Sequence, residues 1–248
     1  MNCLVILQNM TALSVNINKI ATLRNARGGT EPNLINHALN IEKFGAQGIT
    51  VHPRPDGRHI KYEDVRLLKK HLTVELNIEG NPKENSFVEL VLETSPKQVT
   101  LVPDTTGQLT SDHGWDTIKN KSFLIEMVSL FKAKNIRTSL FVDPEEKNIV
   151  GAQETGTDRI ELYTESFAAN FSKDRQNAIS SYIRSAELAS SLDLELNAGH
   201  DLNLENLKYF ASNIKNLKEV SIGHALIADA LNYGMENTVN MYLRALRK

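Results

Sequence analysis

Aliphatic and polar side chains alternate in eight short segments that recur along the chain. Alternate side chains of a β-strand point to opposite faces, so each segment predicts a strand. In seven of the segments one face is aliphatic and the other carries Ser, Thr, Asn, His, Glu or Asp. The predicted strands are residues 13–18, 48–53, 73–79, 98–103, 137–143, 159–164, 193–198 and 219–224.

The two faces of these strands call for different surroundings. The aliphatic face, which includes Val15 and Ile49, is expected to lie under helices. The polar face includes Ser14, Thr50 and Glu161, and its groups must meet one another or a ligand. Each buried polar group left unsatisfied costs on the order of 1 to 3 kcal/mol. A closed barrel with a polar interior meets this requirement.

Helix-like stretches lie between the strands, with apolar residues three and four positions apart, as in Leu34, Ala38 and Ile41. Eight βα units in 248 residues match the usual size of about 250 residues for a (β/α)₈ TIM barrel. We therefore predict an α/β fold with one TIM-barrel domain over residues 1–248, of which 1–11 form a short N-terminal extension. Further helices are expected at residues 64–72, 87–93, 145–154, 177–192, 204–211 and 225–246.

A doubly wound open sheet is the alternative architecture, since it also alternates strands with helices. Helices cover both faces of its central strands, which should then be aliphatic on both faces. The polar second face of the strands in this chain favours the barrel.

The composition narrows the class of partner. A formal net charge of -2 gives no electrostatic reason to expect nucleic acid or an anionic membrane, and a small-molecule ligand is expected. The single Cys3 excludes an internal disulfide, and the first ten residues lack a basic lead and a long apolar run. No stretch approaches the roughly 20 apolar residues of a membrane span. A cytoplasmic enzyme is the expectation.

Histidines gather where a TIM-barrel enzyme builds its active site, at the carboxyl ends of the strands. A single histidine is more often structural, but five at one rim favour a functional cluster, whereas His37 and His71 fall within helix patterns. The rim histidines are His52, His59, His113, His200 and His224.

Glu79 ends the third predicted strand on the inward face. With histidines, whose unperturbed pKa is about 6.5, this carboxylate could form a general acid and base set. Metal ligation is the rival use, but neither a His-x-His pair nor an HExxH motif is present. We therefore expect no metal site.

Several residues could hold phosphate groups. Arg27, Arg54 and Arg58 lie in glycine- or proline-containing loops after predicted strands, and arginine binds phosphate with two parallel hydrogen bonds. Gly223 precedes an expected helix N-terminus after the eighth strand, a usual phosphate position in this fold. Lys19 is the lysine near a strand end that a Schiff-base aldolase would need.

A set of motifs in this order resembles the pyridoxine 5'-phosphate synthase (PdxJ-type) family of vitamin B6 biosynthesis. The motifs are VNINKIATLRNARGG, GITVHPRPDGRHI, LNIEG, LVPD, RTSLFVDP, RIELYTE, LNAGHDLN and IGHALIADAL. The resemblance implies a (β/α)₈ barrel that assembles as a homo-octamer and uses no metal or organic cofactor. It also implies a transferase-type synthase that condenses 3-amino-2-oxopropyl phosphate with 1-deoxy-D-xylulose 5-phosphate and releases phosphate and water.

The resemblance assigns roles residue by residue. His52 and Glu79 match proton acceptors, and His200 matches the proton donor. The positions that match contacts to the aminoketone phosphate are Asn16, Arg27, Gly223 and His224. The positions that match contacts to the pentulose phosphate are Arg54, His59 and Thr110.

Three expected substrate-binding positions depart from the family pattern. Asn18 and Lys19 stand where the family has Asp and His, and Asp201 stands where a glycine usually follows NAGH. An acidic side chain beside a phosphate is unfavourable unless it points away, so Asp201 is expected to contribute through its backbone.

Other functions stay open on the residues alone. A sugar-phosphate isomerase or aldolase barrel would have one phosphate site, and the aldolase would use Lys19. A metal-dependent barrel hydrolase would carry stoichiometric metal. A non-catalytic barrel subunit is disfavoured because His52, Glu79 and His200 are all present.

Overall fold

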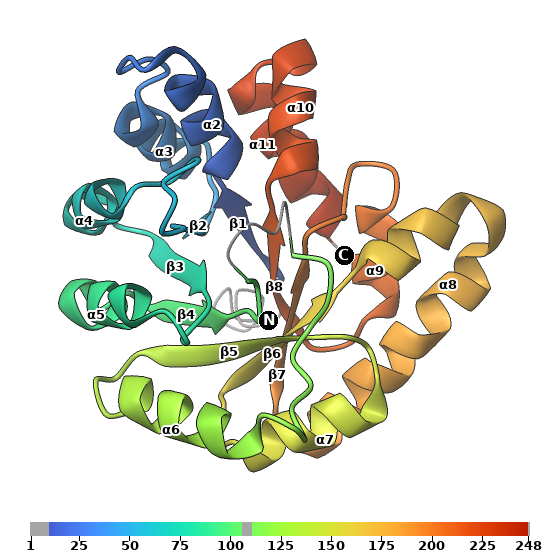
Figure 1. Cartoon of the computed structure of the whole chain (residues 1–248). Helices are drawn as coiled ribbons and strands as arrows, with labels where there is room; N and C mark the ends of the chain where they lie inside the picture. The colour runs from blue at the N-terminus through green and yellow to red at the C-terminus, as the bar shows by residue number, and fades with distance from the viewer. Residues whose placement is uncertain (1–9, 106–110, 248) are drawn as a thin grey trace, which may run out of the picture.

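The computed structural model describes residues 10–105 and 111–247, and within these ranges eight parallel strands close into a barrel (Figure 1). Each strand pairs with the next in sequence, and the eighth pairs with the first. The strands are β1 (Ala12–Asn16), β2 (Gly48–Val51), β3 (Glu75–Gly80), β4 (Gln98–Leu101), β5 (Arg137–Val142), β6 (Arg159–Tyr163), β7 (Glu195–Gly199) and β8 (Leu217–Ile222). The predicted fold class is confirmed, and the predicted strand ends agree with the structure to within two residues.

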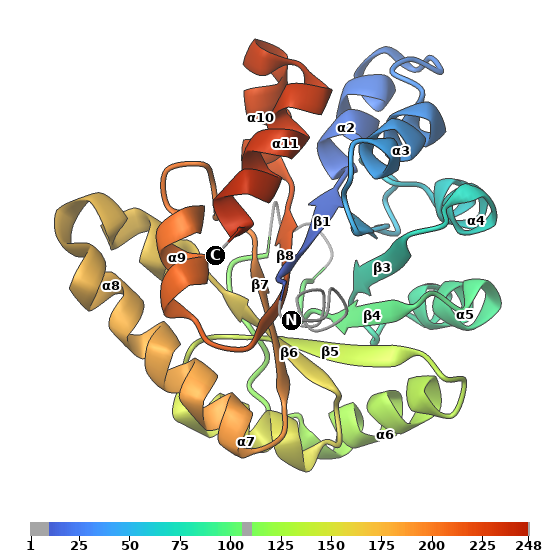
Figure 2. The same ribbon diagram turned by 180° about the vertical axis from the view of Figure 1, so that it is seen from behind.

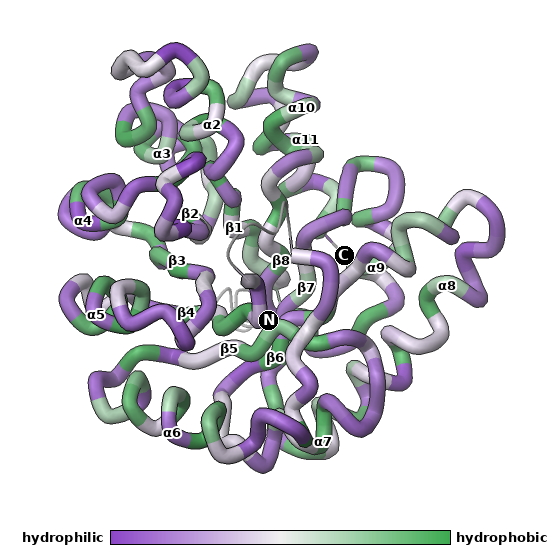
Figure 3. The backbone as a smooth tube through the Cα atoms, viewed as in Figure 1, coloured by the Kyte–Doolittle hydropathy of each residue, from purple (hydrophilic) through white to green (hydrophobic). Residues whose placement is uncertain are grey.

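The helices form a ring around the barrel, as both views of the ribbon show (Figures 1 and 2). They are α2 (Asn18–Arg27), α3 (Leu34–Lys43), α4 (Tyr62–His71), α5 (Asn85–Thr94), α6 (Lys121–Lys132), α7 (Glu146–Glu154), α8 (Glu165–Ser191), α9 (Leu207–Asn213), α10 (His224–Tyr233) and α11 (Met235–Leu246). Hydrophobic and hydrophilic residues alternate along the outer helices (Figure 3). This pattern lets one side of each helix cover the aliphatic face of the strands.

The two strand faces have the surroundings that their side chains require. Val15 and Ile49 of the outer face are fully buried in the core between strands and helices. Inside the barrel, the hydroxyl groups of Ser14 and Thr50 lie 2.6 Å apart. Asn77 extends this contact, because its Nδ2 donates to Thr50 at 3.4 Å and its Oδ1 accepts from the hydroxyl of Thr100 at 3.1 Å. These inward polar groups of β1 to β4 therefore bond to one another across neighbouring strands.

Charged side chains fill the amino end of the barrel. Arg159 lies at the start of β6 and donates to Glu195 at 2.7 Å, and its Nη1 lies 3.6 Å from Glu219. Arg159 and Glu219 are 9% and 5% exposed. Paired charges therefore occupy the interior of the barrel at this end.

Three local features differ from the predicted elements. β1 stops at Asn16, and α2 starts two residues later, so Asn18 and Lys19 begin a helix rather than end a strand. The expected helix over residues 225–246 is two helices, because Gly234 has a φ of +76° between α10 and α11. α8 begins earlier than expected and contains a non-helical residue, Asp174.

Two further expectations concern the N-terminal segment and the membrane. The predicted extension over residues 1–11 lies outside the described residues except for Met10 and Thr11. Of the helices in residues 10–105 and 111–247, none has the length and apolar character that crossing a membrane requires.

Candidate functional site

Glu79 lies at the carboxyl end of β3, where side chains from β1 and β8 form hydrogen bonds with its carboxyl group. Its Oε2 accepts from Nδ2 of Asn16 at 3.4 Å, and its Oε1 accepts from the hydroxyl of Ser221 at 3.5 Å. Burial raises the pKa of Glu79 to about 8; the charges of Asp104 and Glu219 add to this effect, and His200 opposes it. Glu79 is therefore largely protonated at pH 7 and becomes a proton acceptor as the pH rises.

His52 lies between two carboxyl groups just beyond β2. Its Nδ1 is 3.9 Å from Oε2 of Glu79, and its Nε2 is 3.9 Å from Oδ2 of Asp104. The backbone N–H of His52 donates to the side chain of Asn18 at 3.0 Å, which fixes its position. Burial lowers the pKa of His52 well below its usual value, and the positive charge of Arg54 adds to this. The imidazole is neutral at pH 7 and has a nitrogen that can accept a proton.

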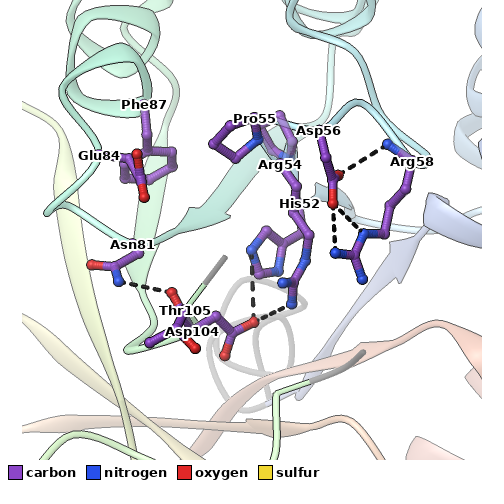
Figure 4. A pocket seen from close by; sticks show the side chains of 11 residues that line it. His52, Arg54, Pro55, Asp56, Arg58, Asn81, Glu84, Phe87, Asp104 and Thr105 are labelled. Atoms are coloured by element: carbon purple, nitrogen blue, oxygen red, sulfur yellow. Dashed lines mark hydrogen bonds and ion pairs between the residues drawn. The ribbon is translucent and has the colours of Figure 1, made fainter. Parts of the chain in front are cut away.

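Arg54 forms a buried ion pair with Asp104, which follows β4 (Figure 4). The two side chains are 8% and 3% exposed, and Ser111 donates to the same carboxylate at 2.8 Å. Oδ1 of Asp104 is buried and has no hydrogen-bond partner within the described residues. The sequence pattern places Asp104 on the inward face but does not single it out. A bound phosphate would meet a guanidinium that is already paired.

The loop after β2 lines a pocket with His52, Arg54, Arg58 and Asp104 (Figure 4). Arg58 pairs with Asp56 at 2.5 Å within the loop. The pocket combines a neutral imidazole with two guanidinium groups, each paired with a carboxylate that lines the same pocket.

His59 takes part in this loop as a neutral ring. Its Nδ1 accepts from the backbone N–H of Ile60 at 2.9 Å. Burial lowers the pKa of His59 to about 4, and the charges of Arg54 and Arg58 add to this. Because Nδ1 accepts, the ring proton lies on Nε2. His59 can offer a ligand a hydrogen bond but no positive charge.

α2 holds the β2 loop in place through residues that the sequence pattern does not single out. Asn25 donates to the carbonyl of His59 at 2.8 Å and to that of Gly57 at 3.2 Å. Arg24 donates to His59 at 3.3 Å and forms a two-bond ion pair with Asp64. This position for α2 corrects the expectation that Arg27 lies in a loop, because Arg27 is the last residue of the helix and is exposed.

His200 follows β7 and faces the ring of Tyr163 at a centroid distance of 5.4 Å. Oδ2 of Asp201 lies 2.7 Å from its Nδ1. The Asp201 side chain therefore contacts its neighbour His200. The backbone N–H of Asp201 donates to Gly199 and to Thr164, so the expected backbone contact to phosphate would compete with these bonds.

The remaining predicted positions lie around the rim. Lys19 is exposed in the first turn of α2, and His224 is exposed at the first residue of α10. Gly223 lies against β1, where an added Cβ would be 3.0 Å from the Cβ of Asn16, so glycine permits this approach. His113 is exposed and pairs with Asp112. Thr110 lies outside the described residues.

Glu161 of β6 is a buried carboxyl group of the barrel interior that the sequence pattern placed on the inner face without a role. It is 3% exposed, and its Oε2 has no hydrogen-bond partner within residues 10–105 and 111–247. Burial raises the pKa of Glu161 well above its usual value, and the charges of Glu79 and Glu219 add to this. The protonated, uncharged form of this carboxyl group is therefore favoured.

The described part of the chain contains no group of three or more His, Cys, Asp or Glu side chains placed to hold a metal ion. The groups that converge on the rim are instead arranged in pairs with unlike pKa values. Such pairs are suited to moving protons.

The fold and this rim define a (β/α)₈-barrel protein with ionisable groups clustered at the carboxyl ends of its strands. The family model for the pyridoxal phosphate biosynthesis protein PdxJ matches residues 13–248. Pyridoxine 5'-phosphate synthase of Flavobacterium johnsoniae is 59% identical over 238 residues, which cover 96% of this chain and 100% of the relative. The synthase of Christiangramia forsetii is 60% identical over the same shares. The chain belongs to the pyridoxine 5'-phosphate synthase family and is a biosynthetic enzyme.

Solved structures of other barrels resemble the chain at low identity. A phosphoribosylanthranilate isomerase from Thermotoga maritima aligns with a TM-score of 0.61 at 16% identity, over 96% of this chain and 98% of the other. A 3-keto-L-gulonate-6-phosphate decarboxylase from Vibrio cholerae aligns with a TM-score of 0.64 at 8% identity, over 96% and 100%. These likenesses concern the fold alone.

Proposed function

We propose that the protein condenses 3-amino-2-oxopropyl phosphate with 1-deoxy-D-xylulose 5-phosphate to form pyridoxine 5'-phosphate, with release of phosphate and water. The observation that carries the proposal is the close approach of Glu79 and His52, whose pKa values shift in opposite directions. Imine formation, phosphate elimination, ring closure and dehydration all move protons on and off adjacent carbon and oxygen atoms. Each positioned acid or base typically contributes about 10²- to 10⁴-fold to such steps.

The roles follow the family pattern. His52 and Glu79 are the proton acceptors, and His200 is the proton donor. The neutral state of His52 supports an acceptor role, and the pairing of His200 with Asp201 supports a protonated donor.

The two phosphorylated substrates occupy different parts of the rim. The residues proposed to hold the aminoketone phosphate are Asn16, Arg27, Gly223 and His224. The residues proposed to hold the pentulose phosphate are Arg54, His59 and Thr110, with Asn18, Lys19 and Asp201 flanking the substrates. Arg54 and His59 lie close enough for the charge of Arg54 to lower the pKa of His59, which supports the second assignment.

The proposed setting is a cytoplasmic homo-octamer with no metal or organic cofactor. The octamer and the cytoplasmic location rest on family resemblance. Native mass spectrometry of the purified protein would give the number of subunits directly. A mass that does not correspond to eight chains would contradict the octamer.

The reaction is tested by mixing purified protein with both substrates and following pyridoxine 5'-phosphate and inorganic phosphate, with no metal added and with a chelator present. Product with matching phosphate release supports the synthase, and a mixture without the aminoketone controls for slow phosphate loss. No product from a folded protein contradicts the proposal. Isomerisation of the pentulose phosphate alone would then favour the isomerase alternative.

A further inference from the structure

β7 ends in a tight turn that brings two consecutive side chains together. His200 has a φ of +68°, and the N–H of Asp201 donates to the carbonyl of Gly199 at 3.0 Å. A hydrogen bond between residues two apart, around a positive φ, is typical of the strained type of γ-turn. Residues in such sparsely populated conformations persist only where their surroundings hold them.

Neighbouring strands hold this turn. The N–H of His200 donates to the carbonyl of Ser221 in β8 at 3.2 Å. The N–H of Asp201 also donates to the hydroxyl of Thr164, beyond β6, at 3.3 Å, and that hydroxyl donates to the carbonyl of Gly199. The turn is therefore fixed from both sides, and the relative placement of the two side chains is set by the barrel.

The side chains of His200 and Asp201 form a hydrogen bond at the mouth of the barrel. Oδ2 of Asp201 lies 2.7 Å from Nδ1 of His200, and the two side chains are 29% and 30% exposed. An ionised carboxylate only accepts hydrogen bonds, so Nδ1 carries a proton. Nε2 is then the ring nitrogen through which His200 can exchange a proton with a substrate.

The charges around His200 favour its protonated form. Burial lowers its pKa, but the hydrogen bond and charge of Asp201, together with Glu79 and Asp104, outweigh burial and raise the pKa of His200. The positive charge of His200 in turn acts on His52. The ionisable groups facing His200 are Asp201 from its own loop, Glu79 from β3, Asp104 beyond β4, Tyr163 from β6 and His52 beyond β2.

We propose that Asp201 is a positioning residue that acts through His200, holding the ring by Nδ1 so that Nε2 is the nitrogen that delivers the proton. This inference rests on the proposed function, in which His200 is the proton donor. The imidazolium also neutralises the carboxylate, so an acidic residue is tolerated beside a bound phosphate. In a chain with glycine at this position, no carboxylate would be available for this contact.

The titration of His200 can be measured in the whole protein by following the exchange of its C2 proton with deuterium by mass spectrometry over a pH series. The measurement does not depend on the oligomeric state. In the wild type, His200 should titrate above the ordinary value of about 6.5. In Asp201→Asn, which keeps an oxygen acceptor but loses the charge, the titration should shift down by about one pH unit, a tenfold change in proton affinity. Asp201→Gly should shift it in the same direction.

A matched control is Glu205→Gln, which removes a carboxylate from the same loop at an exposed position. It should leave the titration of His200 unchanged. Steady-state kinetics give the second readout: the alkaline limb of kcat should move to lower pH in Asp201→Asn, with little change in either KM. A merely structural role for Asp201 would lower the melting temperature and leave both titrations in place.

The inference is overturned if His200 of the wild type titrates at or below 6.5, a result that needs no variant to fold. It is also overturned if His200 titrates at the same pH in Asp201→Asn as in Glu205→Gln. Failure of the proposed function is a separate result. If the wild type makes no pyridoxine 5'-phosphate but the titration of His200 still shifts in Asp201→Asn, the interaction of the two residues stands and only the proposed reaction is contradicted.

Discussion

Oε2 of Glu79 lies 3.9 Å from Nδ1 of His52, and burial favours the uncharged form of both groups. It raises the pKa of the Glu79 carboxyl to about 8 and lowers that of the His52 imidazole well below its usual value. At pH 7 the pair is a protonated acid beside a neutral base rather than a carboxylate beside an imidazolium. Glu79, whose pKa is about 8, is therefore the member of the pair that gains or loses a proton more readily near neutral pH.

The raised pKa of Glu79 gives a prediction for both activity and stability. If Glu79 accepts a proton, kcat/KM should rise with pH through about 8, and Glu79→Gln should lose this limb and about 10²- to 10⁴-fold in kcat. Because the folded pKa lies above the unfolded one, the stability that neutral Glu79 contributes is complete below about pH 4.3 and is lost as the pH rises through about 8.

Thermal melts of the wild type and Glu79→Gln at pH 6 and pH 9 check the second half of this prediction. The variant remains neutral at both pH values, so its melting temperature should fall less than that of the wild type on going to pH 9. An equal fall in both proteins would show that Glu79 ionises at its ordinary pH.

His200→Asn should lower turnover far more than substrate affinity. The change removes the proton donor while keeping a hydrogen-bonding side chain of similar size, so kcat is expected to fall about 10²- to 10⁴-fold. Steady-state kinetics with each substrate varied in turn measure the separation. Loss confined to the two KM values, with kcat unchanged, would contradict the donor role.

Arg54→Ala should mainly raise the KM for 1-deoxy-D-xylulose 5-phosphate. Loss of a hydrogen bond to a charged group is worth roughly 1.5 to 3 kcal/mol, which corresponds to about a 10- to 100-fold change. Arg54→Lys keeps the positive charge but loses the planar pair of donors. Its KM for 1-deoxy-D-xylulose 5-phosphate should therefore lie between those of the wild type and Arg54→Ala.

The pairing of Arg54 with Asp104 calls for a further control. Arg54→Ala leaves Asp104 buried without its partner, so part of any effect could come from that carboxylate. The double variant Arg54→Ala/Asp104→Asn removes the unpaired charge. A KM that returns to the wild-type value in the double variant would show that Arg54 does not bind the phosphate.

The barrel could be predicted from the sequence because period-two alternation is a strong signal when it recurs between helix-like segments. Val15 and Ile49 on one face, and Ser14 and Thr50 on the other, have the burial and contacts that alternation implies. α2 could not be recognised in this way. Its buried residues are Ile20, Ala21 and Arg24, which give almost no apolar stripe, so residues 18–27 did not stand out as a helix.

The location of the candidate site could be predicted from the sequence, but the contacts between its side chains could not. The rule that barrel sites lie at the carboxyl ends of the strands placed His52, Glu79 and His200 at one rim. The contact of Arg54 with Asp104 joins residues fifty positions apart and depends on the path of two loops. The contact of His200 with Asp201 depends on a positive φ, which no periodic pattern reports.

A last prediction concerns the ion pair that joins α2 to the first turn of α4, directly after the β2 loop. Arg24 and Asp64 form two hydrogen bonds, of 2.6 and 2.8 Å, with side chains 11% and 12% exposed. Arg24→Met leaves a buried carboxylate without its partner and should cost about 3 to 5 kcal/mol. At roughly 2 to 4 °C per kcal/mol for a protein of this size, the melting temperature should fall by about 6 to 20 °C.

Two variants make this measurement specific. Asp64 also accepts the N–H of Lys61 at the start of α4, at 2.8 Å, and Asn can keep that bond. The double variant Arg24→Met/Asp64→Asn should therefore recover much of the lost stability. Arg66→Met breaks a similar two-bond pair with Glu93, but its side chains are 40% and 53% exposed, so the loss of stability should be much smaller. Equal losses in Arg24→Met and Arg66→Met would show that burial does not make the Arg24 pair important.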